Sequence, residues 1–586
     1  RIAGLSARTV LAIGGGYALT LALSAGLAVG LAKSGWLLRG EAVLLAAMLA
    51  FIVYPCIVIA VFVTRRARDQ GSLRSAFSWL HTWAGVGLGG VLFAMFWMGS
   101  LAVFDREIDR WMMPATRLPP APAEISLDRM LRGTVERIGA GTEHFSAVMP
   151  THRTPTLQVR YVDPQTQERV LRHVDPRSGE VLETGSLGGT GFIYPFHYDL
   201  HIDWQRLGIW IAGFAGLAML ILIVSGVVIH RRLFADFFVF RPQGKAIRST
   251  LDLHNVTGVL ALPFHFVITL SGLIIFFSIF FNGTWRAVYG ADEAAFGREI
   301  FGTFERPKSG ARAELGSLDA MLREAQARWG GGQPAFVQVR NPGDAAGYVG
   351  MNRSTAHRVA VTPDQIYFDA ASGSFIQRAQ PHPLERVQRF IAGMHRVQFD
   401  SWALRWFYFF AGLSGCVMIA TGFLYWMEAR RVQHASNTLG FRIVQALTIG
   451  SVSGIIASTM MFFVVNRCLP LHVHVGETAR DGLEMWTFYL TWLATFAHAA
   501  VRGRRAWAEQ CWAIAALAFA AVGLNWITTG DHPLRAIAGG RLNIACVDAM
   551  LVLGASVAAL SARRLQRQSW SFRSAPDERQ LESARG

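Results

Sequence analysis

The chain has 586 residues, of which 52% are hydrophobic and only 16% are charged, and its mean hydropathy is +0.30. These values exclude an ordinary soluble globular protein and predict a mainly α-helical, polytopic membrane protein. The formal net charge is +16. No basic patch lies on a soluble domain of its own, so we do not expect nucleic acid as a partner.

The apolar stretches predict ten transmembrane helices, because each is long enough to cross a hydrocarbon core of roughly 30 Å. They lie at about residues 10–32, 41–63, 80–104, 208–230, 256–281, 403–427, 442–466, 484–501, 507–528 and 543–562. The short connectors that are rich in Arg and Lys all fall on one side of the bilayer, which marks that side as cytoplasmic. We therefore expect both termini in the cytoplasm and the two long connecting segments outside it.

The predicted helix at 80–104, which carries His81, belongs to an internal duplication. The sequence "LHTWAGVGLGGVLFAMFWMGSLAVF" from Leu80 aligns without a gap with "LHNVTGVLALPFHFVITLSGLIIFF" from Leu253, which matches His81 with His254. Each copy is predicted to contain a helix, an extracytoplasmic α+β module and a returning helix. Because each copy holds an even number of spans, the copies have parallel topology and form a duplicated four-helix core.

This duplication gives the expected domain organisation. The domains are an N-terminal two-helix membrane domain (1–66), the first repeat (76–235, with its module at 105–207), the second repeat (250–431, with its module at 282–402), a C-terminal four-helix membrane domain (442–562) and a cytoplasmic tail (563–586).

The two modules show the same order of elements. Each begins with a helix-like stretch (Ser126–Ile138; Ser317–Trp329) and continues with a strand-like run (Leu157–Val162; Ala335–Val339). Each closes on a hairpin, "HVDPRSGEVL" or "YFDAASGSFI", with a glycine where a tight turn needs positive φ. Matched glycines also occur in the helices, and there we expect them only to allow close helix packing: Gly99, Gly226, Gly272 and Gly422.

The histidines near the ends of the core helices are the candidate functional residues, because an ionisable side chain in an apolar helix is costly. His81 and His254 lie at the cytoplasmic starts of their helices, whereas His201 and His395 lie just before the returning helices, on the other side. With pseudo-twofold symmetry, His81 faces His254 and His201 faces His395. The pattern predicts two bis-histidine haem sites, one in each leaflet.

Three other histidines are alternatives. His230 lies on the cytoplasmic level, but its counterpart in the second repeat is Trp426. His197 lies one turn before His201 and is the rival ligand outside. His265 lies near mid-bilayer, about 16 Å along the helix from His254, where it either supports a site or ligates one of the two haems.

The sequence contains no recognisable motif for other cofactors. The five cysteines are scattered and never form C-x-x-C or C-x-x-C-H, which excludes covalent haem and Cys-ligated iron–sulfur clusters. The only Gly-rich run, Gly14–Gly16, lies inside the first apolar span, and no Walker motif occurs, so neither NAD(P)H nor ATP has a recognisable site.

Between about 76 and 431, the motifs "LHTWAGV", "VSGVVIHRR", "DLHNVTGVLALPFH", "TLSGL" and "ATGFLYW" resemble the PepSY-associated transmembrane helix family. Residues 1–66 resemble a two-helix domain fused to such proteins in iron-uptake systems. The resemblance implies a bacterial inner-membrane ferric-siderophore reductase with two haem b groups. Such a protein passes electrons from the cytoplasmic side to a ferric siderophore or other iron chelate in the periplasm. The electron donor is left open between a quinol, a reduced flavin and a partner reductase.

An iron chelate would dock over the outer haem, where aromatic and cationic side chains gather in two segments. These candidates are Trp204, Trp285, Arg286 and Tyr289. An interfacial aromatic belt is the competing interpretation.

A membrane transporter for iron, haem or siderophore is the alternative function, because ten helices exceed what an electron relay needs. A non-catalytic sensor or protease-regulating module gives no reason for paired histidines.

Overall fold

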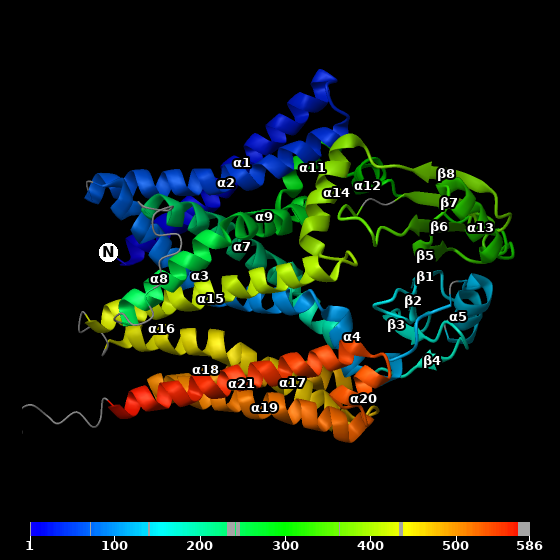
Figure 1. Ribbon diagram of the computed structural model, residues 1–586. Helices are drawn as coiled ribbons and strands as arrows, with labels where there is room; N and C mark the ends of the chain where they lie inside the picture. Colours follow the sequence, from blue (N-terminus) through cyan, green and yellow to red (C-terminus); the bar gives the residue numbers. More distant parts are fainter. Residues whose placement is uncertain are drawn as a thin grey trace, which may run out of the picture.

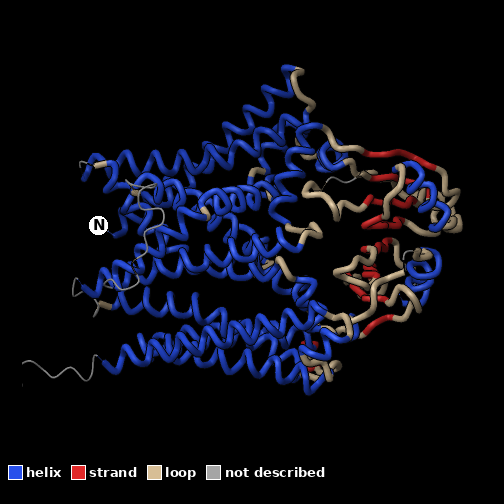
Figure 2. The backbone as a smooth tube through the Cα atoms, in the orientation of Figure 1, coloured by secondary structure: helices blue, strands red, loops and turns tan. Residues whose placement is uncertain are grey.

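The computed structural model describes residues 2–70, 72–122, 124–138, 141–230, 241, 246–361, 364–432 and 438–571. Long helices lie side by side in a bundle, and one antiparallel sheet lies beyond one end of it (Figure 1, Figure 2). The predicted cytoplasmic connector residues Arg231, Arg232 and Lys245 lie outside the described residues, as does most of the predicted tail.

Within the described residues, eight helices are long and apolar enough to cross a membrane, or nine if one bent pair counts as a span. The protein is therefore a membrane protein. The main helices are α1 (Ile2–Ser34), α2 (Arg39–Gln70), α3 (Leu73–Ala102), α7 (Leu207–Ile229), α15 (Trp402–Val432), α16 (Leu439–Ile449), α17 (Ile455–Cys468), α18 (Arg480–Arg502), α19 (Ala506–Thr529) and α21 (Leu542–Ser571).

The bent pair is α8 (Ala246–Leu260) and α9 (Leu262–Ile275), which meet at an angle of 64°. Pro263 lies in the first turn of α9. It has no backbone N–H to donate, and its ring clashes with a carbonyl of the preceding turn, so a continuous helix breaks here. The sequence predicted a single span over 256–281, whereas α9 ends at Ile275 and three short helices follow: α10 (Phe277–Phe280), α11 (Asn282–Tyr289) and α12 (Glu293–Phe301).

The sheet contains strands from both predicted modules, in the order β4-β3-β2-β1-β5-β6-β7-β8. Its strands are β1 (His144–Val148), β2 (Leu157–Val162), β3 (Arg169–Val174), β4 (Val181–Leu182), β5 (Pro334–Arg340), β6 (Tyr348–Arg353), β7 (Gln365–Asp369) and β8 (Phe375–Ala379). The sequence predicted two modules without joining them. The antiparallel pairing of β1 with β5 joins the two modules into one sheet. Without this pairing, β1 and β5 would each be an edge strand with unpaired backbone groups.

The helices of the two modules cap each other. Asp319, in α13 (Leu318–Trp329), accepts hydrogen bonds from Ser126 Oγ at 2.6 Å and from the Leu127 amide. In return, Asp128 accepts from Ser317 Oγ at 2.7 Å and from the Leu318 amide at 2.9 Å. Each carboxylate thus satisfies orphan donors at the start of the opposite helix.

The closing hairpins agree with the sequence. Gly179 and Gly373 have φ of +76° and +73°, as the tight turns were predicted to require.

A buried charge cluster joins the sheet to the helix bundle. Glu107, in α4 (Asp105–Met112), accepts hydrogen bonds from Arg153 at 3.0 and 2.7 Å and from Arg405 of α15 at 2.7 Å. All three residues are buried. Burial would raise the pKa of Glu107, but the hydrogen bonds and charges of the two arginines lower it overall.

We expect Glu107→Ala to lower the free energy of unfolding by about 3–5 kcal/mol, because it leaves the buried guanidinium of Arg405 without a carboxylate and that of Arg153 with only Asp105, at 3.4 Å. The contribution of Glu107 is fully present above its ordinary pKa of 4.5 and is lost as the pH falls through the lowered pKa of the folded state. Thermal or denaturant unfolding in detergent measures both effects. Glu168→Ala, at an exposed carboxylate of the same module, is the control and should change little.

Candidate functional site

The structure brings His81 and His254 together near the end of the bundle that is far from the sheet. His81 comes from α3 and His254 from α8, and their ring centroids lie 6.2 Å apart with an interplanar angle of 83°. We call these two residues the far-side pair. The sequence predicted that they face each other, and they do.

A second pair of histidines lies at the sheet end of the bundle. His197, in α6 (Tyr194–Asp199), faces His395, in α14 (Pro383–Arg396). Their ring centroids are 5.8 Å apart, and the rings are inclined by 28°. We call them the sheet-side pair.

The prediction that His201 faces His395 is wrong. The His201 ring stacks on Phe192 with centroids 4.9 Å apart, and its Nε2 lies 2.9 Å from the Phe192 carbonyl oxygen. Leu200 and His201 have φ of +55° and +50°, so the chain turns away from the axis of α6 before it reaches His201.

The sequence carried a signal for the correct residue. An alignment without gaps that matches Phe192-Ile193 with Phe390-Ile391 also matches Trp204 with Trp402, and it places His197 on His395. We predicted His201 because it lies just before the returning helix, and this criterion was less reliable than the alignment.

Each of the four rings is held through Nδ1 by a backbone carbonyl on a neighbouring element. The oxygens are those of Leu222 for His81 (3.1 Å), Met418 for His254 (2.7 Å), Met95 for His197 (2.7 Å) and Ile268 for His395 (2.7 Å). When Nδ1–H donates to a carbonyl, the lone pair of the ring lies on Nε2, which is the nitrogen that ligates a metal. Burial lowers the pKa of His197 and lowers that of His395 to about 3, so both rings are neutral, as ligation requires.

Each ring also rests on a glycine. A Cβ on Gly99 would lie 2.7 Å from the His197 ring, and one on Gly272 would lie 2.5 Å from the His395 ring. At the far side, a Cβ on Gly226 would lie 3.3 Å from His81, and one on Gly422 would lie 3.1 Å from His254. We expected these four glycines only to pack helices against one another. Instead, each makes room for one of the four paired histidines.

The two pairs lie at different depths. Met95, whose carbonyl holds His197, is 14 residues beyond His81 on α3, which corresponds to a rise of about 21 Å. The far-side pair therefore lies near the start of α3, whereas the sheet-side pair lies beside the other half of the same helix.

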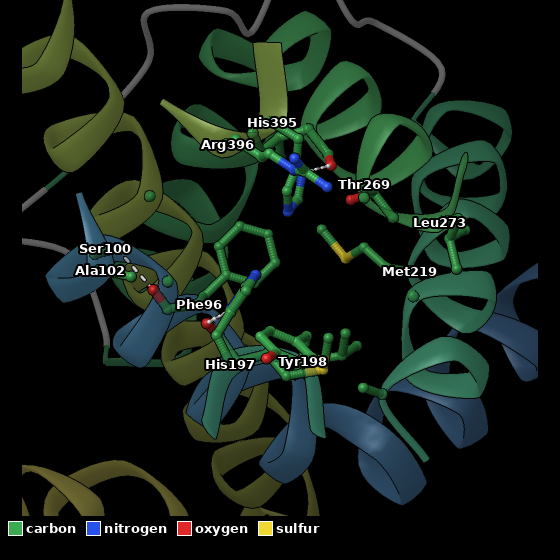
Figure 3. Close-up of a pocket in the computed structure, with 18 of the residues that line it drawn as sticks. Phe96, Ser100, Ala102, His197, Tyr198, Met219, Thr269, Leu273, His395 and Arg396 are labelled. Carbon is green, nitrogen blue, oxygen red and sulfur yellow. Dashed lines mark hydrogen bonds between the residues drawn. The ribbon is translucent and has the colours of Figure 1, made fainter. Parts of the chain in front are cut away.

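A cavity of about 150 Å³ adjoins the sheet-side pair. This is much more than the roughly 10–15 Å³ that one water needs. Figure 3 shows His395 and Arg396 on one side of the cavity and His197 and Tyr198 on the opposite side. Most of the remaining wall is apolar, including Leu92, Met95, Phe96, Met219 and Leu273. Such a space suits a largely apolar group.

The spacing of the rings fits two axial ligands of one metal. With a metal–imidazole bond of about 2.0–2.1 Å, and a ring centre roughly 1.2 Å beyond the bonding nitrogen, the two ring centres of opposed ligands lie about 6.4–6.6 Å apart. The observed separations are 6.2 and 5.8 Å. No group of three or more His, Cys, Asp or Glu side chains within the described part of the chain is arranged to hold a metal ion. Two imidazole ligands leave the remaining coordination positions of a metal to a macrocycle, as in haem b.

Two of the alternative ligands, His230 and His265, lie outside the two histidine pairs. His230 is half-buried and follows the last residue of α7. His265 is buried in α9, where its Nε2 lies 3.3 Å from the Ala411 carbonyl oxygen and its ring contacts Phe96 edge-on. At both levels, the rings that face each other are those of the two pairs.

The predicted docking surface is only partly exposed. Trp204 is 70% exposed and Arg286 is exposed. Trp285 and Tyr289, however, are 6% and 8% exposed, because both pack into the core formed with α2 and α12. The expectation that all four form one surface is wrong for these two residues.

The flanking helices support the elements that carry the sheet-side pair. Glu41 of α2 accepts a hydrogen bond from the Leu384 amide in the first turn of α14, at 3.2 Å. On the other side, Tyr489 of α18 donates to the Leu200 carbonyl at the end of α6, at 2.8 Å, and Phe462 of α17 stacks on Phe192. The N-terminal helix α2 thus supports α14, beside which it begins (Figure 1), and the C-terminal helices support α6 and the residues before it.

The comparisons with known proteins bear on this central region. The family model of the PepSY-associated TM region matches residues 78–429, which include both histidine pairs. The chain belongs to this family. An uncharacterized protein of Pseudomonas aeruginosa, PA4219, is 24% identical over 294 residues, which cover 46% of this chain and 71% of that protein. The matched region contains most of α3 and α15, all of α7, α8 and α9, and the whole eight-stranded sheet.

We expect Gly99→Ala to destabilise the protein by about 1–3 kcal/mol, because the new Cβ overlaps the His197 ring and forces it or the helix to move. Gly87, on the same helix, has open space where a Cβ would lie, with no atom within 4 Å. Gly87→Ala is therefore the matched control and should be neutral or slightly stabilising. Thermal unfolding of the two variants in detergent measures the difference. Equal stability would show that the His197 ring does not depend on Gly99.

Proposed function

We propose that this protein is an oxidoreductase of the bacterial inner membrane that binds two haem b groups and reduces ferric siderophores in the periplasm. The observation that carries the proposal is the two histidine pairs, whose rings have the separation of axial ligands at two depths of one membrane bundle. The two histidines of each pair would hold one haem, which would supply one-electron transfer when bound.

We also infer that the core is an internal duplication. The mirrored strand order, the reciprocal Asp128 and Asp319 caps and the four equivalent glycine–histidine contacts support it. With α18 and α19 counted separately on either side of the turn at Gly503–Arg505, and with α8 and α9 counted as one bent span, the described part of the chain has ten spans. This topology leaves both termini in the cytoplasm and the sheet in the periplasm.

The residues of the chain hold the geometry that electron transfer needs. Backbone carbonyls orient each imidazole, and the glycines let the rings approach the neighbouring helix. Rigid, pre-oriented ligands reduce the rearrangement that accompanies a change of charge. The far-side pair is near the cytoplasmic electron donor in this topology, and the sheet-side pair is near the periplasm.

The substrate is an iron(III) chelate. Each iron(III) gains one electron and becomes iron(II), which hard oxygen ligands hold more weakly. A cytoplasmic-side donor of two electrons, such as a quinol or reduced flavin, reduces two iron(III) centres and releases its protons; a partner reductase is the other possible donor. The chelate stays outside the membrane, so the reaction needs no transport path for it.

The purified protein should show a b-type absorbance spectrum with two haems per chain after reduction with dithionite. We expect His197→Ala or His395→Ala to lose about half of the haem, because one axial bond of the sheet-side site is missing. His81→Ala or His254→Ala should lose the other half.

The matched control is His201→Ala, which removes a neighbouring histidine that bonds to Phe192 instead. It should retain both haems. Loss of haem in His201→Ala, with retention in His197→Ala, would contradict the assignment. A wild-type protein without haem would contradict the proposed function itself.

A further inference from the structure

Arg396 occupies an unusual position beside the sheet-side pair. It follows His395 at the end of α14 and lines the cavity. Its Nε is buried and has no hydrogen-bond partner among the described residues. A guanidinium group is costly to desolvate without a partner. The Arg396 side chain is half-buried, and its Nε at the wall of the apolar cavity has no acceptor among the described residues.

Two tyrosines lie near this guanidinium. Tyr194 and Tyr198 line the same cavity from α6, and both are close enough to Arg396 to interact with its charge. In the register that places His197 on His395, Tyr198 matches Arg396, so the residue after each sheet-side histidine lines the cavity. Arg396 thus presents a cation from one side of the cavity, and Tyr198 presents a hydroxyl group from the opposite side (Figure 3).

We propose that Arg396, Tyr194 and Tyr198 form a carboxylate-binding subsite for the porphyrin that fills this cavity. The inference rests on the proposed function and deepens it. The ligand must combine an apolar, planar body with an anionic edge, because the cavity wall is apolar and the group that lacks a partner is a cation. A porphyrin with carboxylate side chains has this chemistry. The planar guanidinium matches a carboxylate with two parallel hydrogen bonds.

Iron-free protoporphyrin tests the subsite separately from iron ligation. The full-length chain, prepared without haem, is titrated with protoporphyrin IX and with its dimethyl ester, which lacks free carboxylates, and porphyrin fluorescence reports binding. We expect wild type to bind the diacid about tenfold more tightly than the diester at one class of site, as one charged hydrogen bond implies.

The variants are Arg396→Gln, Arg396→Lys and a control, Arg386→Gln, which changes an exposed arginine on the same helix. Arg396→Gln should weaken diacid binding about tenfold and leave diester binding unchanged, and the unchanged diester affinity also shows that the variant is folded. Arg396→Lys should keep part of the preference, because it keeps the charge without the planar fork. Arg386→Gln should behave as wild type.

Several results would overturn the inference. Equal affinities of wild type for diacid and diester would do so, as would an Arg396→Gln variant that still prefers the diacid. Equal weakening of both ligands would show that Arg396 only supports the fold. If Arg396 instead binds a lipid phosphate, Arg396→Gln would reduce copurifying phospholipid and leave both porphyrin affinities unchanged. Failure of wild type to bind either porphyrin would overturn the proposed function as well.

Discussion

The structure depends on the contact between a histidine ring and the helix beside it. At all four positions, Nδ1 bonds to a backbone carbonyl while a glycine leaves the space for the ring. A side chain at any of these glycines would overlap or crowd the ring. In lipid, where small residues allow helices to approach, this arrangement fixes both the distance between helices and the direction of each imidazole.

The need to hold these histidine rings in place explains a role for the helices at both ends of the chain. The sheet-side histidines come from α6 and α14, which are not long membrane spans and need support from their surroundings. That support comes from α2 on one side and from α17 and α18 on the other. The buried Glu107 cluster holds the sheet against the same end of the bundle. The helices outside residues 76–431 thus have a structural role, whether or not they have another.

Much of the architecture was predictable, because hydropathy and ungapped self-similarity are local or linear signals. They predicted the membrane class, the facing of His81 and His254, and the turns at Gly179 and Gly373. Two features depended on contacts between distant segments. The β1–β5 pairing joins residues nearly 200 positions apart, and Trp285 is buried by helices from the N-terminus. A third feature, the path after Leu200, follows from a positive φ. The sequence analysis chose the wrong partner for His395, although the alignment of the two repeats matches His395 with His197.

The central claim is that each histidine pair provides both axial ligands of one iron porphyrin. Electron paramagnetic resonance of the oxidised protein tests it most directly, because two imidazoles give a low-spin ferric signal whose anisotropy depends on the angle between their planes. The account predicts two low-spin signals: a strongly anisotropic one for the far-side pair, at 83°, and a rhombic one for the sheet-side pair, at 28°. A high-spin ferric signal, or a single low-spin species with one haem per chain, would contradict it.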